Sequence, residues 1–214
     1  DIKTVIIRDQ SRFIEASIEE VKFHLVLAAI LVSLTILIFI RDWRTTVIAT
    51  LAIPTSMIPT FAFMSYMGYS LNNITMLGLI LAIGIVIDDA VVVHENIFRH
   101  MEEKGLTPIQ AAIDGTKEVG LAVMATSMSL IVVFLPVAFM GGIVGRFMYS
   151  FGVTMAFAIA VSLLVSFTLT PMMASRYLRR EDLHHEGSRD KGVYAKIEGV
   201  YLTLLDWSMA HRWA

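Results

Sequence analysis

Residues 79–93 read LILAIGIVIDDAVVV and place two adjacent acids, Asp88 and Asp89, in an otherwise apolar run. A helix crosses the hydrocarbon core of a bilayer, about 30 Å thick, with about 20 apolar residues. If the helix starts near Asn72, a rise of about 1.5 Å per residue puts the pair roughly 24 Å along it, still at hydrocarbon depth. Each aspartate near the centre of a membrane helix costs about 2.5–3.5 kcal/mol, and helix packing does not require that cost. The stretch therefore predicts a transmembrane helix that carries a functional pair of acids.

The composition of the chain is that of a membrane protein. Of its 214 residues, 56% are hydrophobic and 17% are charged, and the mean hydropathy is +0.69. The net charge of −2 leaves no strongly basic surface, so no nucleic acid is expected as a partner. Because the chain has no cysteine, it forms neither disulfides nor thiolate metal sites. We expect the lipid bilayer as its immediate partner, and we expect no cofactor and no bound metal.

Long uncharged runs predict the membrane-spanning helices. The run from 45 to 87 is too long for one crossing, and the glycine and asparagines at 68–73 supply a turn within it. A second turn is predicted at 141–146, where three glycines fall close together. The predicted fold class is an all-α integral membrane protein, a five-helix transmembrane bundle. Its helices are predicted at about 11–40, 45–67, 72–98, 108–138 and 147–174.

The distribution of charge orients these helices. Most lysines and arginines of the short connections gather on one side, whereas the other side holds only Arg146. Because cytoplasmic loops are rich in basic residues, the basic side is predicted to be cytoplasmic. Residues 1–10 then lie outside and include a short strand at 2–7. Residues 177–192 are predicted as a cytoplasmic loop, and 193–212 as an amphipathic helix on the inner membrane surface; an ordinary soluble amphipathic helix is the alternative.

The two aspartates have the properties of a proton switch. Hydrocarbon disfavours the charged form of a carboxylic acid, and a second carboxylate nearby disfavours it further. A lysine or arginine brought close favours ionisation, and such a pair titrates as one coupled unit. If that approach changes with conformation, protons are taken up on one side and released on the other, drawing on about 2.3 kcal/mol per charge per 100 mV. The alternative is structural, namely a neutral hydrogen-bonded link between helices.

Three further features bear on this proton relay by Asp88 and Asp89. The hydrophobic cores of the predicted helices contain no lysine or arginine, so we expect the countercharge to come from helices outside this chain. Glu95 lies on nearly the same helix face as Asp88, where it could carry protons toward the cytoplasm. Alternatively, Glu95 marks the point where the helix enters water. Since the chain begins at Asp1 without an initiator methionine or a signal segment, we expect it to be part of a longer polypeptide.

Residues 84–96, GIVIDDAVVVHEN, resemble the fourth transmembrane helix of resistance-nodulation-division (RND) efflux transporters of the hydrophobe/amphiphile branch. In that family the helix carries paired proton-binding aspartates, which match Asp88 and Asp89. Three shorter segments also resemble the family: SLNNITM at 70–76, PVAFMGG at 136–142 and LTP at 169–171. The likeness extends over about residues 2–178. The branch that transports heavy-metal ions resembles this chain less, because it usually lacks the second aspartate.

The resemblance implies a place in a larger transporter. The predicted helices would be the second to sixth of the amino-terminal half of the transmembrane domain. Residues 1–10 would end a periplasmic porter subdomain, and 193–212 would be the surface helix before the seventh span. The missing second half of the transmembrane domain would supply a lysine that faces the aspartates. Family members are homotrimers in the bacterial inner (cytoplasmic) membrane and work with a periplasmic adaptor and an outer-membrane channel.

The function implied by this resemblance is drug/proton antiport, carried out by a multi-pass secondary active transporter and not by an enzyme. Protons would be the coupling ion. One alternative is a related superfamily member that exports lipid or assists protein export, with proton or sodium coupling. Another is a helical module that does not transport and only assembles with a partner.

Overall fold

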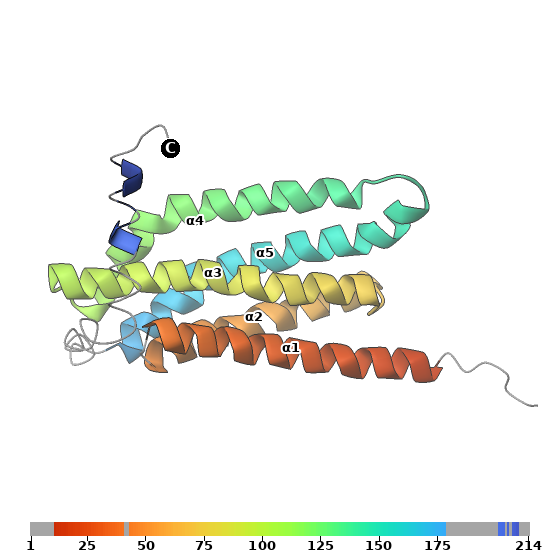
Figure 1. The fold of residues 1–214 in the computed structure, drawn as a ribbon, viewed down its shortest axis with the longest axis horizontal. Coiled ribbons are helices and arrows are strands. Elements are labelled where there is room, and N and C mark those ends of the chain that lie inside the picture. The colour runs from red at the N-terminus through yellow and green to blue at the C-terminus, as the bar shows by residue number, and fades with distance from the viewer. Residues whose placement is uncertain (1–10, 41–42, 179–200, 204, 206, 210–214) are drawn as a thin grey trace, which may run out of the picture. The chain divides into compact units, whose positions relative to one another are not determined.

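The computed structural model describes residues 11–40, 43–178, 201–203, 205 and 207–209. Between residues 11 and 178, all regular structure that it describes is helical (Figure 1). The helices are α1 (Ser11–Ile40), α2 (Trp43–Tyr66), α3 (Asn73–Lys104), α4 (Pro108–Ala138) and α5 (Gly142–Tyr177). The predicted strand at 2–7 and residues 179–192 of the loop predicted at 177–192 lie outside the described residues, whereas residue 177 is the last of α5. Of the surface helix predicted at 193–212, the few described residues are helical.

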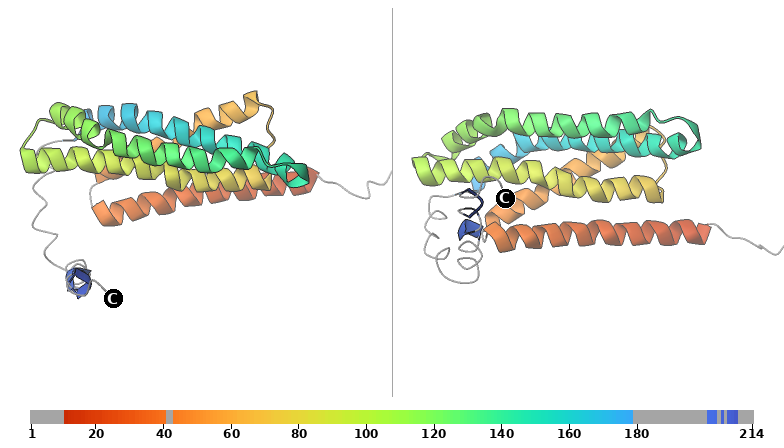
Figure 2. Two further views of the ribbon diagram at one scale, coloured as in Figure 1. Left: turned by 90° about the horizontal axis from the view of Figure 1, so that it is seen from above. Right: turned by 45° about the horizontal axis from the view of Figure 1, so that its top comes forward.

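The helices of residues 11–178 lie alongside one another as a bundle (Figures 1 and 2). By length and composition, α2, α3, α4 and α5 are each long and apolar enough to cross a membrane. The apolar part of α1, Lys22–Ile38, is shorter. The predicted class, an all-α membrane protein, is therefore confirmed, whereas the number of crossings stays a prediction.

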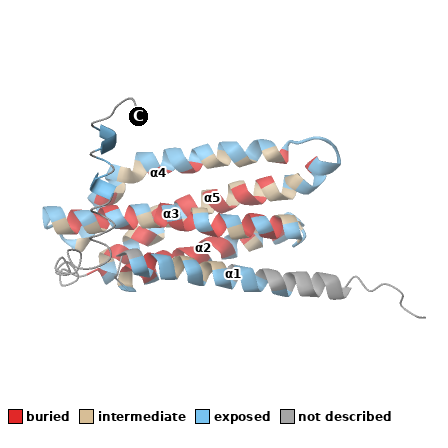
Figure 3. Cartoon of the chain, in the orientation of Figure 1, coloured by how far each residue is buried: buried red, intermediate tan, exposed pale blue. Residues whose placement is uncertain are grey.

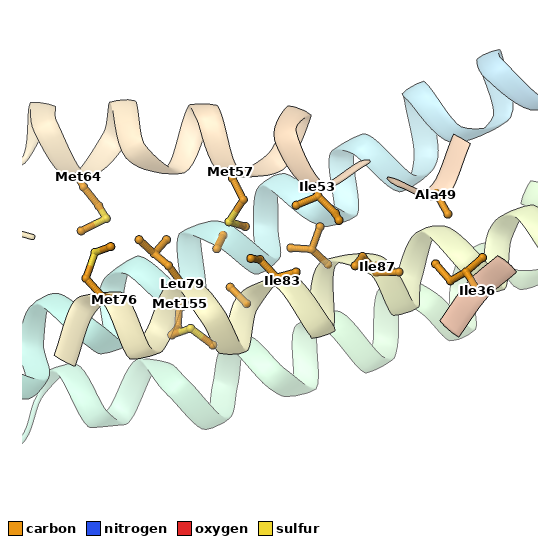
Figure 4. Close-up of a cluster of buried hydrophobic side chains, with 13 residues drawn as sticks. Ile36, Ala49, Ile53, Met57, Met64, Met76, Leu79, Ile83, Ile87 and Met155 are labelled. Carbon is orange, nitrogen blue, oxygen red and sulfur yellow. The ribbon is translucent and has the colours of Figure 1, made fainter. Parts of the chain in front are cut away.

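The core of the bundle lies between α2, α3 and α5, and consists of aliphatic and methionine side chains. In Figure 4, Met57 and Met64 of α2 point toward Leu79 and Ile83 of α3, with Met155 of α5 beside them. Buried positions are frequent on α3, whereas most of α4 is exposed (Figure 3). In the most apolar window of each helix, 56% of α3 is buried inside the chain, compared with 17% of α4. The helix that carries the aspartates is thus a central element of the bundle.

Two helices extend beyond their predicted ends. α3 continues past residue 98 to Lys104. The prediction used the length of the apolar run, which indicates how much of the helix lies in hydrocarbon but does not show where the helix ends in water. Gly105 ends α3 in the left-handed conformation, with φ 60°. α5 begins at Gly142 and not at 147, so the turn predicted at 141–146 was wrong over most of its length. The reversal between α4 and α5 needs few residues because Gly142 adopts φ 78°, which glycine reaches without strain.

A capping box defines the start of α3. The Asn72 side chain accepts hydrogen bonds from the backbone N–H groups of Ile74 and Thr75, both at 3.0 Å. In return, the backbone N–H of Asn72 donates to Thr75 Oγ1 at 3.0 Å. These bonds satisfy donors that have no partner within the helix, and they fix the residue at which α3 begins.

Replacing the capping side chain, Asn72→Ala, is expected to destabilise the protein by about 1 kcal/mol, the usual loss at such a cap. Thermal unfolding of the detergent-solubilised protein measures the change. Asn72→Asp serves as the control, because aspartate retains the side-chain acceptor and should melt close to the unsubstituted protein. Equal melting of the alanine and aspartate variants would contradict the capping role.

Candidate functional site

α3 presents Asp88 and Asp89 to different surroundings. Successive residues of an α-helix point about 100° apart, so two adjacent side chains cannot share one environment. Asp89 is turned toward α4 and is only 7% exposed. Asp88 is exposed within the described part of the chain. The two acids predicted from the sequence therefore share one level of α3, with one packed inside the bundle and the other open.

α4 supplies the hydrogen-bond partner of Asp89. Ser127 Oγ donates to Asp89 Oδ2 at 2.8 Å, and the same oxygen lies 2.9 Å from the backbone carbonyl of Val123. Ser127 is completely buried. The sequence alone does not identify Ser127 as this partner. Its only signal is a polar side chain in an apolar run, and the segment MATSMSL at 124–130 offers three such side chains without indicating which one faces α3.

α5 fixes the backbone of α3 close to the acids. Ser162 Oγ donates to the carbonyl oxygen of Val86 at 3.1 Å, and the serine is fully buried. A carbonyl inside a helix already accepts one intrahelical bond, and its second lone pair is free for a side chain. The bond joins α5 to the turn of α3 that precedes Asp89, so this turn is held from two neighbouring helices.

A cavity of about 490 Å³ opens beside the two acids, between α3 and α4. Both carboxyl-bearing residues line it, together with one other polar residue, Thr126. The remaining lining is small or apolar: Gly84, Ile85, Val92, Ala122, Val123 and Leu130. A mostly apolar cavity with two acidic residues in its lining suits a group that is itself largely apolar and carries one positive charge.

Side-chain contacts fix α4 against the C-terminal part of α3. Asn96 Nδ2 donates to the carbonyl oxygen of Gly115 at 2.8 Å, in a buried contact. Glu118 lies 3.0 Å from Arg99 and 2.9 Å from the ring Nε2 of His100. A side chain at Gly115 would approach the backbone of α3 to 3.0 Å, so glycine permits this close packing. These contacts set the register that brings α4 alongside the aspartates.

Glu95, the predicted exit group, is exposed like Asp88 and follows it on nearly the same face of α3. The buried residues at this level, His94 and Asn96, lie on the other side of the helix. Glu95 is therefore separated from Asp89 and its serine, and shares only the open face with Asp88.

Within the described residues, no positive side chain accompanies the aspartates. The sequence has no lysine or arginine at 45–98, at 119–145 or at 147–175, which are the central parts of α2 to α5. The described residues also contain no group of three or more histidine, cysteine or acidic side chains that could hold a metal ion. Protonation of these acids, or a cation supplied from outside this chain, stays a prediction.

Comparison with known proteins gives one consistent result. Residues 1–214 match the model of the AcrB/AcrD/AcrF family. The chain is 46% identical over 209 residues to the multidrug resistance protein MdtC of Citrobacter koseri, covering 96% of this chain and 20% of that protein. It is 43% identical over 217 residues to MdtC of Pectobacterium atrosepticum, covering 100% of this chain and 21% of that protein. The chain therefore spans about a fifth of the length of the curated relatives it matches.

Proposed function

Because the chain belongs to the AcrB/AcrD/AcrF family of RND transporters, we propose that it is part of the proton-conducting membrane unit of a multidrug exporter. The complete protein exchanges protons for hydrophobic compounds across the bacterial inner membrane. It is a secondary active transporter and not an enzyme. Its likeness to proteins named for multidrug resistance and its apolar helices of membrane length support this function.

The observation that carries the proposal is the placement of Asp88 and Asp89 in the apolar centre of α3, one exposed and one buried, and both beside a cavity. Acids at this depth are costly, and they are typical of ion and proton pathways in membrane proteins. Because the two carboxyl groups are adjacent, ionisation of one opposes ionisation of the other. They therefore bind and release protons as a pair, and an approaching cation decides when release occurs.

The cavity between α3 and α4 is the proposed position of that cation. A lysine has a long apolar stem and a compact charged end, which match a cavity lined by apolar side chains with acids at one place. In our proposal a helix from the second half of the transmembrane domain covers this cavity and brings its lysine to Asp88. Loss of a proton from the pair and approach of the lysine then favour each other.

Glu95 is the proposed next station toward the cytoplasm. Its exposed position on the face that it shares with Asp88 supports this role. A carboxylate at the end of the apolar run is well placed to receive protons released from the pair and pass them to water.

The complete exporter is proposed to be a homotrimer that works with a periplasmic adaptor and an outer-membrane channel. Membership of the family supports this assembly. In this proposal residues 1–10 belong to the periplasmic domain and 193–212 lie on the cytoplasmic membrane surface. Drug selection belongs to parts of the protein outside this chain.

Proton coupling is tested in proteoliposomes that contain the complete exporter, a pH gradient and an internal pH-sensitive dye. Addition of hydrophobic dyes that the protein exports should accelerate collapse of the gradient several-fold over the leak without dye. Vesicles without protein are the control for passive leak. An imposed sodium gradient should have no effect on transport, because a carboxyl pair in hydrocarbon binds protons far more readily than hydrated sodium.

Export that follows the sodium gradient and leaves the pH gradient unchanged would contradict the proposal. That outcome favours a sodium-coupled relative within the same superfamily.

A further inference from the structure

The hydroxyl group of Ser127 has one hydrogen and two acceptors within reach. Asp89 Oδ2 lies 2.8 Å from Ser127 Oγ, and the carbonyl oxygen of Val123 lies 2.9 Å from it. A hydroxyl donates one full hydrogen bond and accepts others through its lone pairs. The serine therefore has two alternative arrangements, which differ in the acceptor that takes its hydrogen.

Each arrangement suits one protonation state of Asp89. When the carboxylate is ionised, it only accepts, and the serine hydrogen points to Asp89 Oδ2. When Asp89 is protonated, its O–H donates to Ser127 Oγ and the serine hydrogen turns to the carbonyl of Val123. Both residues are buried, at 0% exposure for the serine and 7% for the aspartate, so bulk water is a poor substitute partner. In either state no buried polar group loses its hydrogen bond, which would otherwise be costly.

We propose that Ser127 is a positioning residue for proton exchange at Asp89, serving as donor to the carboxylate and as acceptor from the acid. The inference rests on the proposed function, since it assigns a partner to one of the two proton carriers. It also distinguishes the carriers. Asp89 binds and releases its proton while it is hydrogen-bonded to the hydroxyl of Ser127 on α4. Asp88 lies on the open side of α3, where the countercharge approaches it.

Few other charged side chains or histidines lie around Asp89. On α3 these are Asp88 and the buried His94. The apolar parts of the neighbouring helices contain only one such side chain, His24 of α1, and the other charged side chains stand at helix ends. The nearest such residues along each neighbour are His24 on α1, Arg44 on α2, Glu118 on α4, and Arg146 and Arg176 on α5. The hydroxyl of Ser127 is therefore the principal polar influence from α4 on this carboxyl group.

The test uses the complete exporter in proteoliposomes, with the pH difference across the membrane held constant while both pH values are varied together. In Ser127→Ala the carboxylate loses a charge-assisted hydrogen bond, which is worth more than the bond lost by the neutral acid. The acid form is then favoured, and release of the proton requires a more alkaline medium. The pH profile of dye export should move by about one pH unit toward alkaline pH.

Two variants make this shift specific. Ser127→Thr retains the hydroxyl group and should restore the original profile. Ser129→Ala makes the same chemical change on an exposed face of α4 and should leave the profile unchanged. If Ser127→Ala failed to reach the membrane, Ser127→Cys would carry the test, because a thiol is a weak donor and should give a smaller shift in the same direction.

The outcomes separate the two proposals. A uniform fall in rate at every pH, or a profile that coincides with that of the unsubstituted protein, overturns the role of Ser127 while Asp89→Asn remains inactive. If Asp89→Asn itself exports dye normally, the proton-relay function is overturned, and the role of the serine is overturned with it. An alkaline shift that Ser127→Thr reverses supports the inference.

Discussion

Replacement of both acids, Asp88→Asn and Asp89→Asn, is expected to abolish energised export by the complete protein. Asparagine has nearly the size of aspartate and still accepts a hydrogen bond from Ser127, but it neither binds nor releases a proton. Because asparagine carries no charge into the hydrocarbon, the amount of the variant in the membrane should not fall. Drug resistance of a sensitive host and dye efflux from its cells measure the loss, which should reach the level of cells without the exporter.

A second acidic pair on the same helix provides the control. Glu102 and Glu103 are adjacent near the end of α3 and lie beyond its apolar part. Their joint change to glutamine removes the same number of charges without touching the buried site, and it should retain most of the export. Export that persists in the Asp88 and Asp89 variant would show that the acids are a structural link between helices, and the relay would have to be abandoned.

The sequence predicted the membrane class and the position of the acids because both depend on local properties. Apolar runs longer than a core helix needs belong in lipid, and the runs can be counted without knowing their neighbours. The start of α3 is local as well, since Asn72 and Thr75 form the cap within one turn. Near Gly142 the same approach failed, because three glycines in six residues resemble a loop although one left-handed glycine suffices for the reversal.

The arrangement around the acids depends on contacts between distant parts of the chain. Ser127 lies 38 residues from Asp89, and helical periodicity alone does not reveal which polar side chain of α4 faces α3. The angle between adjacent residues shows that Asp88 and Asp89 must differ in environment. Only the packing of α4 on α3 decides that Asp89 is the buried member.

That packing gives the second large effect, at the close contact between α4 and α5. Gly152 of α5 is buried, and a Cβ atom placed there would lie 2.8 Å from the carbonyl oxygen of Phe134 and 2.9 Å from the backbone nitrogen of Ala138. Both atoms belong to the backbone of α4, so no change of rotamer relieves the overlap. Gly152→Leu should therefore separate the helices and prevent the exporter from accumulating in the membrane. Gly152→Ala should reach the membrane but lose about 1–3 kcal/mol of stability.

Gly120→Ala is the control for these two variants, because it adds the same methyl group to α4 where the nearest atom, on the ring of Phe167, is 3.9 Å away. Alanine also favours the helix over glycine by up to about 1 kcal/mol, so this variant should melt at or above the temperature of the unsubstituted protein. Thermal unfolding in detergent compares all three. If Gly152→Ala melted like Gly120→Ala, the helices would have room to separate at no cost. The close contact with Gly152 and the hydrogen bond from Ser127 to Asp89 are both made by α4. A loose contact at Gly152 would therefore also allow the hydroxyl of Ser127 to move away from Asp89.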